Sequence, residues 1–180
     1  MNKLRSYLKR IYRLSLNSQK QEDIFWSDLK KLHDDLEWSH GVYEKDKFIE
    51  AIFEISDGQA GKFYFMVYDS CFHCRAKILE DFSIELTTDL FILAAHFNNL
   101  LHHGIVIVNV NSRYIEYHHK RDLLIPLLYN GEIKNQIARH FSAAKDIYSA
   151  FQRLVEEQEA PAIIIADLLN KNEREGENAE

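Results

Sequence analysis

Three consecutive segments of this chain alternate apolar and polar residues, and no other feature constrains the fold as strongly. They are residues 47–56, 62–69 and 71–79. Successive side chains of a strand point to opposite faces, so a two-residue period is typical of half-buried β-strands. A turn that begins at Asp57-Gly58 joins the first two segments. The pattern predicts an antiparallel meander with one apolar face.

The alternation also predicts which residues share a face of this sheet. In the middle segment, Phe63, Phe65 and Val67 fall on one face and are expected to enter the core. The opposite face carries three large side chains that become a candidate partner surface if no helix covers them: Tyr64, Met66 and Tyr68.

The rest of the chain supplies helices and two further strands. Residues 87–103 and 132–157 carry apolar residues at helical spacing. Between them, residues 105–110 and 113–121 read as strands joined by a tight turn. Residues 163–169 form a short apolar segment, either helix or strand. We therefore expect an α+β fold, with a five-stranded antiparallel sheet packed against helices.

The region before the sheet predicts two more helices. Residues 3–16 form one amphipathic helix, which Asn17 and Ser18 interrupt. Either residue can cap a second helix, whose apolar positions run from Ile24 to Leu36 and which residues 39–41 end. The expected element order is α-β-β-β-α-β-β-α with an extra N-terminal helix. At 180 residues, a single domain is expected. We divide it into a basic helix (1–16), a core (17–170) and a mobile acidic tail (171–180).

Charge is distributed unevenly along the chain, whose formal net charge is −6. The first twenty residues contain basic side chains and no acid: Lys3, Arg5, Lys9, Arg10, Arg13 and Lys20. The last twenty-five residues contain eight acids and two bases. The overall negative charge argues against a nucleic-acid partner. The asymmetry suggests a basic arm that has a partner, or two ends that attract each other.

Targeting signals are not evident in the sequence. There is no run of about 18 apolar residues, so a transmembrane helix is not expected. The N-terminus lacks the continuous apolar core and the small-residue cleavage site of a secretory signal. With two cysteines and no export signal, the expected location is the reducing cytoplasm.

Cysteine and histidine residues can bind metals or take part in redox chemistry, but their spacing in this sequence does not match a known site of either kind. Cys71 and Cys74 form a CxxC motif, but there is no second CxxC to complete a zinc site. The pair lies in a strand pattern, which directs the two thiols to opposite faces. The nine histidines include the adjacent pairs 102–103 and 118–119, without an HExxH motif. A cluster formed by folding, with His73 or His96 as a member, stays open as an alternative.

Catalytic signatures are also missing from the sequence. Adjacent carboxylates occur at residues 34–35, 80–81 and 156–157, beside apolar stripes where solvated surface is expected. There is no GxSxG, P-loop or GxGxxG motif. We predict no catalytic residue, no metal ligand and no cofactor, and therefore a protein that is not an enzyme.

The basic N-terminal helix has three interpretations. It packs on the domain as an ordinary amphipathic helix, it docks a partner or the acidic tail, or it lies on an anionic membrane. Its length of roughly 14 residues limits the third interpretation. Its candidate contact residues are Leu4, Tyr7, Leu8 and Ile11.

From Tyr43 to about Leu169, the chain resembles the YbjN family of proposed bacterial sensory transduction regulators. The resemblance lies in FILAAHFNNLLHHGIVIVNVNSRYIEYHH and in IARHFSAAKDIYSAFQRLVEE. It implies a fold similar to type III secretion chaperones and a non-enzymatic role. Members of that wider fold form dimers and hold extended protein segments. The basic helix and the acidic tail look like additions to this pattern.

These observations favour a cytoplasmic protein-binding module, chaperone-like or regulatory, which binds through an apolar patch or an open sheet edge. The expected partner is another protein, in the form of an extended segment, and a homodimer is compatible with the resemblance. Two alternatives stay open. One is a metal- or thiol-dependent enzyme that uses the CFHC segment and histidines. The other is membrane-surface association through the N-terminal helix.

Overall fold

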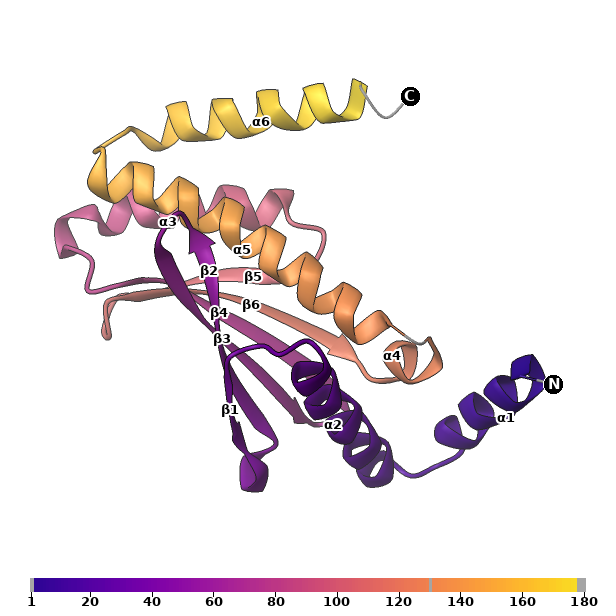
Figure 1. The fold of residues 1–180 in the computed structure, drawn as a ribbon. Coiled ribbons are helices and arrows are strands. Elements are labelled where there is room, and N and C mark those ends of the chain that lie inside the picture. The colour runs from indigo at the N-terminus through magenta and orange to yellow at the C-terminus, as the bar shows by residue number, and fades with distance from the viewer. Residues whose placement is uncertain (1, 130, 178–180) are drawn as a thin grey trace. The chain divides into compact units, whose positions relative to one another are not determined.

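The structure is a computed structural model that describes residues 2–129 and 131–177, with the side chains of residues 5, 7–129 and 131–170. Figure 1 shows the elements in chain order. The helices are α1 (Asn2–Leu14), α2 (Ser18–Asp35), α3 (Thr87–Leu100), α4 (Leu124–Leu128), α5 (Glu132–Glu156) and α6 (Pro161–Glu177), with short 3-10 helices at Glu44–Asp46 and Ile84–Leu86. The strands are β1 (His40–Tyr43), β2 (Phe48–Ser56), β3 (Gln59–Tyr68), β4 (Cys71–Glu80), β5 (Ile105–Asn109) and β6 (Tyr114–Asp122).

The sheet confirms the α+β class but corrects the number of strands. It has six strands in the order β1-β2-β3-β4-β6-β5, not five. The missed strand is β1, where the sequence suggested only the end of a helix. Its four residues are too few for an alternation to be recognised, and three of them are exposed. It pairs antiparallel with β2 and ends the sheet on that side.

Two further differences concern helices. A five-residue helix, α4, contains Pro126 and lies between the strand and the long helix predicted on either side, where the sequence suggested no element. The segment expected at residues 163–169 belongs to α6, which extends from Pro161 to Glu177. Proline suits the first position of a helix, because the missing N–H has no partner there in any case.

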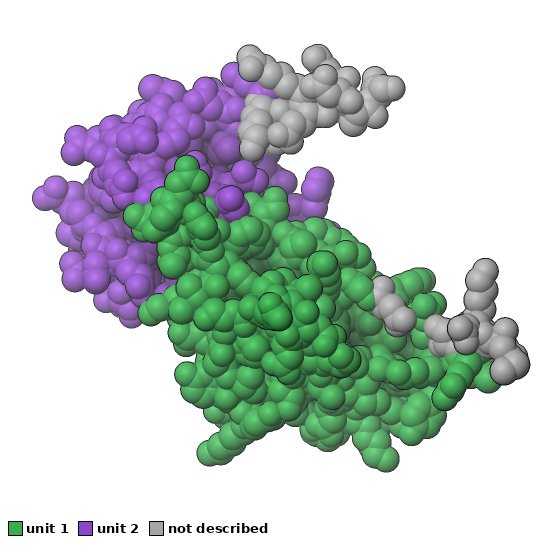
Figure 2. Space-filling model, in the orientation of Figure 1, with its two compact units in different colours: residues 1–76, 118–142 green, residues 77–117, 143–180 purple. Residues whose placement is uncertain are grey.

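The chain forms two compact units, which Figure 2 shows in different colours. Unit 1 contains Met1–Ala76 and His118–Ser142, and unit 2 contains Lys77–Tyr117 and Ala143–Glu180.

Unit 1 is built around one face of strands β2, β3 and β4, here called the inner face. Ala51 lies opposite Phe63, and Phe63 lies opposite Ala76. All three side chains are fully buried. Burying a side chain as large as Phe63 stabilises the fold by about 1.5–3 kcal/mol.

Two helices cover this inner face. Helix α2 begins where Asn17 accepts a hydrogen bond from the backbone N–H of Lys20 at 3.0 Å, as its sequence predicts. It buries Phe25, whose ring centroid lies 5.0 Å from that of Phe72. The first turns of α5 contribute Phe141, whose ring lies 5.5 Å from that of Phe63. Aromatic rings from both helices therefore pack on the side that the alternation marked as apolar.

Unit 2 is organised around α3, which buries Leu90, Leu93 and Phe97. The helix ends at Leu100, three residues earlier than predicted, and residues 102 and 103 follow it in a loop rather than forming its last turn. Asn98 fixes this end, because its amide donates to Val106 O at 3.1 Å and accepts from Val106 N at 2.6 Å.

Helix α6 is held within unit 2 by ion pairs and by apolar contacts. Arg153 bonds to Glu159 and Asp167, with a shortest distance of 2.6 Å to each. Ile164 and Ile165 are buried. Among the described residues, no helix of either unit is long and apolar enough to cross a membrane.

Candidate functional site

The opposite face of the sheet in unit 1, here called the outer face, carries the predicted partner residues. Tyr64 and Met66 are half-buried, and Tyr68 is 37% exposed. They alternate with the buried Phe63, Phe65 and Val67, so the two faces separate as predicted. The outer face therefore presents large, partly exposed side chains on the side of the sheet opposite α2 and the first turns of α5.

A row of aromatic side chains crosses the outer face beside the edge of the sheet. The rings of Tyr43 on β1 and Phe48 on β2 lie 5.0 Å apart. Phe48 in turn stacks on Tyr64 of β3 at 5.6 Å, with planes 16° apart. Cross-strand aromatic pairs stabilise a sheet, and here they also hold the rings in fixed positions. We call Tyr43, Phe48 and Tyr64 the aromatic row.

A second group on the outer face combines rings with cations. Tyr68 stacks on His73, with ring centroids 3.8 Å apart. His73 Nδ1 lies 3.3 Å from His118 Nε2 on β6. Arg75 and Lys120 flank these histidines and form no ion pair with an acidic side chain of the described residues.

These cations and burial keep both histidines neutral near pH 7. The pKa of His73 is lowered to about 4, first by burial and then by repulsion from His118, Lys120 and Arg75. Burial, followed by Arg75 and Lys120, also lowers the pKa of His118. Two neutral imidazole rings can form one N–H···N hydrogen bond, in which a nitrogen of one ring donates and a nitrogen of the other accepts. The positive charge of this group therefore comes from Arg75 and Lys120.

The edge of the sheet beside the aromatic row is formed by β1. This strand is hydrogen-bonded to another strand on one side only, that of β2. Tyr43 is 51% exposed and Val42 is 39% exposed. Neighbouring residues of a strand point to opposite faces, so these two side chains flank the edge above and below. An edge strand presents unpaired backbone groups, which can accept an added strand.

The thiols do not form a reactive pair. Cys74 is buried on the inner face, and burial raises the pKa of its thiol well above the usual value. A thiol in such surroundings is a poor nucleophile, because the reactive form is the thiolate. Cys71 is half-buried. Within the parts of the chain that the structure describes, no three His, Cys, Asp or Glu side chains come together as a metal site.

Helix α1 carries the second group of predicted residues, and its apolar side chains face solvent. Tyr7 is 59% exposed, Leu8 57% and Ile11 47%, with the adjacent Tyr12 at 63%. The side chain of Leu4 lies outside the described residues. An amphipathic helix normally packs through its apolar face. In α1 the apolar face is turned outward instead.

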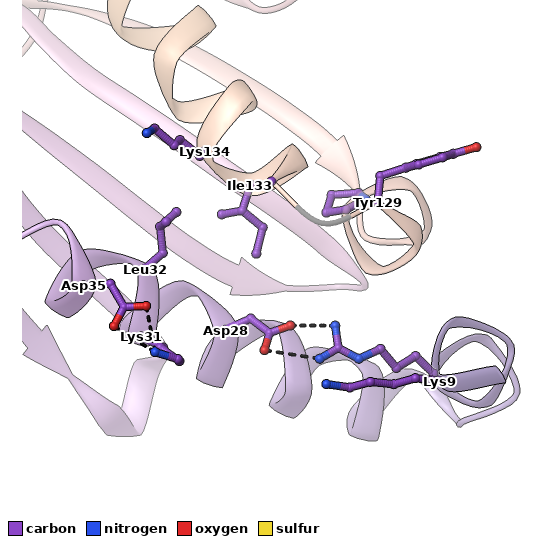
Figure 3. Close-up of a pocket in the computed structure, with 11 residues that line it drawn as sticks. Lys9, Asp28, Lys31, Leu32, Asp35, Tyr129, Ile133 and Lys134 are labelled. Carbon is purple, nitrogen blue, oxygen red and sulfur yellow. Dashed lines mark hydrogen bonds and ion pairs between the residues drawn. The ribbon is translucent and has the colours of Figure 1, made fainter. Parts of the chain in front are cut away.

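The contacts that attach α1 to unit 1 are polar. Arg13 donates to Asp28 of α2 at 2.7 and 3.3 Å, the paired hydrogen bonds drawn in Figure 3. The guanidinium of Arg10 lies 6.0 Å from the ring centroid of Tyr129. Gln21, which is 8% exposed, donates to Leu14 O at 3.1 Å and so caps the C-terminal end of the helix. Arginines and a glutamine therefore help to anchor the helix, whereas Leu8 and Ile11 are left in solvent.

A cavity of about 430 Å³ lies beside α1, and Figure 3 shows the residues that line it. Two of its four cations have acidic partners: Arg13 pairs with Asp28, and Lys31 with an aspartate at 2.7 Å. Lys9 and Lys134 have no acidic partner among the described residues. Lys9 belongs to α1 itself, so Lys134 is the cation without a described acidic partner that the wall adds beside this helix.

Sequence reasoning missed several members of these surfaces. Tyr43 and Phe48 were not singled out, because β1 was not recognised and its register with β2 was therefore unknown. Arg75, His118 and Lys120 come together only when β4 and β6 are neighbours. The alternation of β4 placed His73 and Arg75 on one face, and this was the one available signal.

Comparison with known proteins supports the fold. No family model matches the chain, and no curated protein matches it. The crystal structure of YbjN from E. coli, a proposed transcription regulator, matches with a TM-score of 0.56 at 8% sequence identity. The match covers 72% of this chain and 93% of that one. The chain has a YbjN-like fold.

The YbjN-like fold confirms the resemblance predicted from the sequence. At 8% identity, the likeness concerns the fold alone, and no residue of YbjN is assigned to a position here. The function of a fold resides in its sites. The function of this chain is therefore inferred from its own exposed surfaces.

Proposed function

We propose that this chain is a non-enzymatic, regulatory or chaperone-like module of the cytoplasm that binds an extended segment of another protein. The binding site is the aromatic row of the outer face together with the free edge of β1. The observation that carries the proposal is a row of mutually stacked rings, with Tyr43 51% exposed and Phe48 and Tyr64 half-buried, on the face opposite the one that α2 and α5 cover. Large exposed apolar groups are typical of interaction sites.

The geometry favours an extended segment over a folded surface. A strand added beside β1 would form backbone hydrogen bonds with the free edge. Its alternate side chains would then cover Tyr43 on one face and Val42 on the other, both of which are exposed now. Backbone pairing would supply affinity, and the two exposed side chains would supply selectivity.

The aromatic row is suited to serve as the fixed half of this interface. Tyrosine and phenylalanine provide large contact areas and lose little side-chain entropy on binding. Stacking at 5.0 and 5.6 Å already restrains these rings before a partner arrives. Pre-organised aromatic anchors are the residues that most often dominate binding energy.

The test is to select peptides of about 12 residues, long enough to pair with a strand of ordinary length, against the full chain. Affinities of the selected peptides are then measured by fluorescence anisotropy. The double variant Y64A/M66A should weaken binding at least about tenfold, which corresponds to 1.4 kcal/mol. The matched control is F91A/I92A, because these residues of α3 are 49% and 43% exposed. Equal losses for both double variants would refute the assignment of the site.

A second copy of the chain is the other occupant to be tested. Sedimentation of the wild type and of Y64A/M66A at several concentrations distinguishes the two cases. A monomer that binds peptide supports the proposal. A wild-type dimer that Y64A/M66A converts to monomer would instead show that the outer face pairs with itself.

A further inference from the structure

We propose that helix α1 forms a peripheral membrane-binding surface that is selective for anionic lipid. This surface is separate from the peptide site on the outer face and does not depend on it. It consists of the exposed apolar side chains of α1 and the basic residues beside them. The inference rests on the orientation of the helix, which is the reverse of ordinary amphipathic packing.

The orientation follows from the anchoring contacts of α1. Arg10 and Arg13 are turned toward α4 and α2, whereas Leu8 and Ile11 are 57% and 47% exposed. Residues 8, 11 and 12 lie on one side of a helix, because three- and four-residue spacings return to the same face. A continuous apolar surface is therefore presented to solvent at the N-terminal end of unit 1.

Charge complementarity favours an anionic membrane, and not a second copy of α1, as the partner of this surface. Arg5 and Lys9 are exposed on α1 and form no ion pair with a described acidic side chain, and the first acid of the sequence is Glu22. A second copy of α1 laid on the first would bring like charges together. An anionic surface would instead attract them, as in helices that lie at a membrane interface with Lys and Arg beside an apolar face.

The neighbouring surface supports the same occupant. Lys134 lines the cavity beside α1 and has no acidic partner among the described residues, so it adds one cation to Arg5 and Lys9 of the helix. Each basic residue held near an anionic bilayer strengthens binding about fivefold. The apolar face of one short helix binds weakly alone, so the charge is needed as a second signal.

The experiment is co-sedimentation of the full chain with lipid vesicles. One set contains phosphatidylcholine alone, and the other contains about 30% phosphatidylserine, a composition that gives a negative surface potential. The wild type should bind the anionic vesicles and should be at least tenfold weaker on the neutral ones. Raising the salt from about 0.1 M to about 1 M should release it, because the screening length falls from about 10 Å to about 3 Å.

Two variants and their controls test the residues. L8Q/I11Q should lower vesicle affinity about tenfold or more, whereas I84Q should not, although Ile84 is 66% exposed. R5Q/K9Q should lower it by about 25-fold, since each lost cation contributes about fivefold. K45Q removes an exposed lysine outside α1 and should have no such effect. Circular dichroism of each variant verifies that the fold is intact.

Three outcomes would overturn the proposal. They are equal binding to both kinds of vesicle, no binding to either, and a wild-type dimer that L8Q/I11Q dissociates. The last would assign the face to a second copy of the chain. Variant Y64A/M66A should bind vesicles like the wild type, so failure of this proposal is distinguishable from failure of the peptide site.

Discussion

The two faces of strands β2, β3 and β4 in unit 1 are formed by alternate residues of the same strands, yet they differ in burial and in proposed role. The inner face holds Phe63 and Phe65, both fully buried beneath helices. The outer face holds Tyr64 and Met66, half-buried beside one another. The inner face stabilises the fold, and the outer face leaves aromatic rings available for contact with a partner. In β3, hydrophobic content alone would not have distinguished the two faces, because both carry large apolar or aromatic side chains.

The largest loss of stability is expected from a substitution on the inner face. Phe65→Ala should lower the free energy of unfolding by about 3–5 kcal/mol, because it removes a fully buried ring and leaves a cavity. Tyr64→Ala, its neighbour on the outer face, should cost about 1 kcal/mol or less. Urea unfolding of both variants gives the comparison. Equal costs would mean that the outer face is also structural core.

A second prediction concerns acid pH and compares His73 of the outer face with His140 of α5, whose ring lies 6.0 Å from that of Phe63 on the inner face. Burial first, and then His119, lowers the pKa of His140 to about 3, whereas the pKa of His73 is lowered to about 4. A histidine with a lowered folded pKa contributes stability that is fully present above about pH 6.5 and is lost as the pH falls toward the folded value.

Between pH 7.5 and pH 5, the contribution of His140 should decrease by on the order of 2 kcal/mol. His140→Gln should therefore flatten the unfolding free energy across this range relative to wild type. The flattening by His73→Gln should shrink in added salt, because part of its shift comes from Arg75, Lys120 and His118, with Tyr68 stacked above. Identical salt responses for both variants would contradict this distinction.

A third prediction sharpens the role of the sheet edge. Lysine on an edge strand discourages the addition of another strand. Tyr43→Lys should weaken the selected peptides about tenfold, or 1.4 kcal/mol. Ile105→Lys is the matched control, because β5 ends the sheet on its other side and Ile105 is 49% exposed. If only Ile105→Lys affected the affinity, the peptide would bind at the wrong edge for our proposal.

The smallest expected effect concerns the anchor of α1. A double-mutant cycle with Arg13→Gln and Asp28→Asn should give a coupling of at most about 1 kcal/mol, as for partly exposed ion pairs. The two side chains are 15% and 37% exposed. The coupling should fall in high salt. A coupling near zero at low salt would mean that other contacts hold the helix.

Much of the fold was predictable because alternation and helical spacing are local signals. Strands β2, β3 and β4 followed from a two-residue period, and α2 from its Asn17 cap. Strand β1 was not predictable, since four residues at an edge bury too little to leave a pattern. The prediction of a single domain with a mobile tail is not tested by these observations.

Only some residues of the outer face and of α1 could be assigned to an exposed surface from the sequence. Tyr64, Met66 and Tyr68 came from local alternation, but Tyr43, Phe48 and Lys120 needed the pairing of strands distant in sequence. The apolar stripe of α1 was visible in the sequence, and its direction was not. That direction depends on Asp28 and Tyr129, which lie on other elements and become partners only in the folded chain.

The most direct test of the central claim is amide hydrogen exchange of the full chain with and without a saturating selected peptide. We expect slower exchange in β1 and in the strands that carry the aromatic row, because an added strand would occupy the free edge. Protection confined to α3 or to other parts of unit 2, with β1 unchanged, would contradict it.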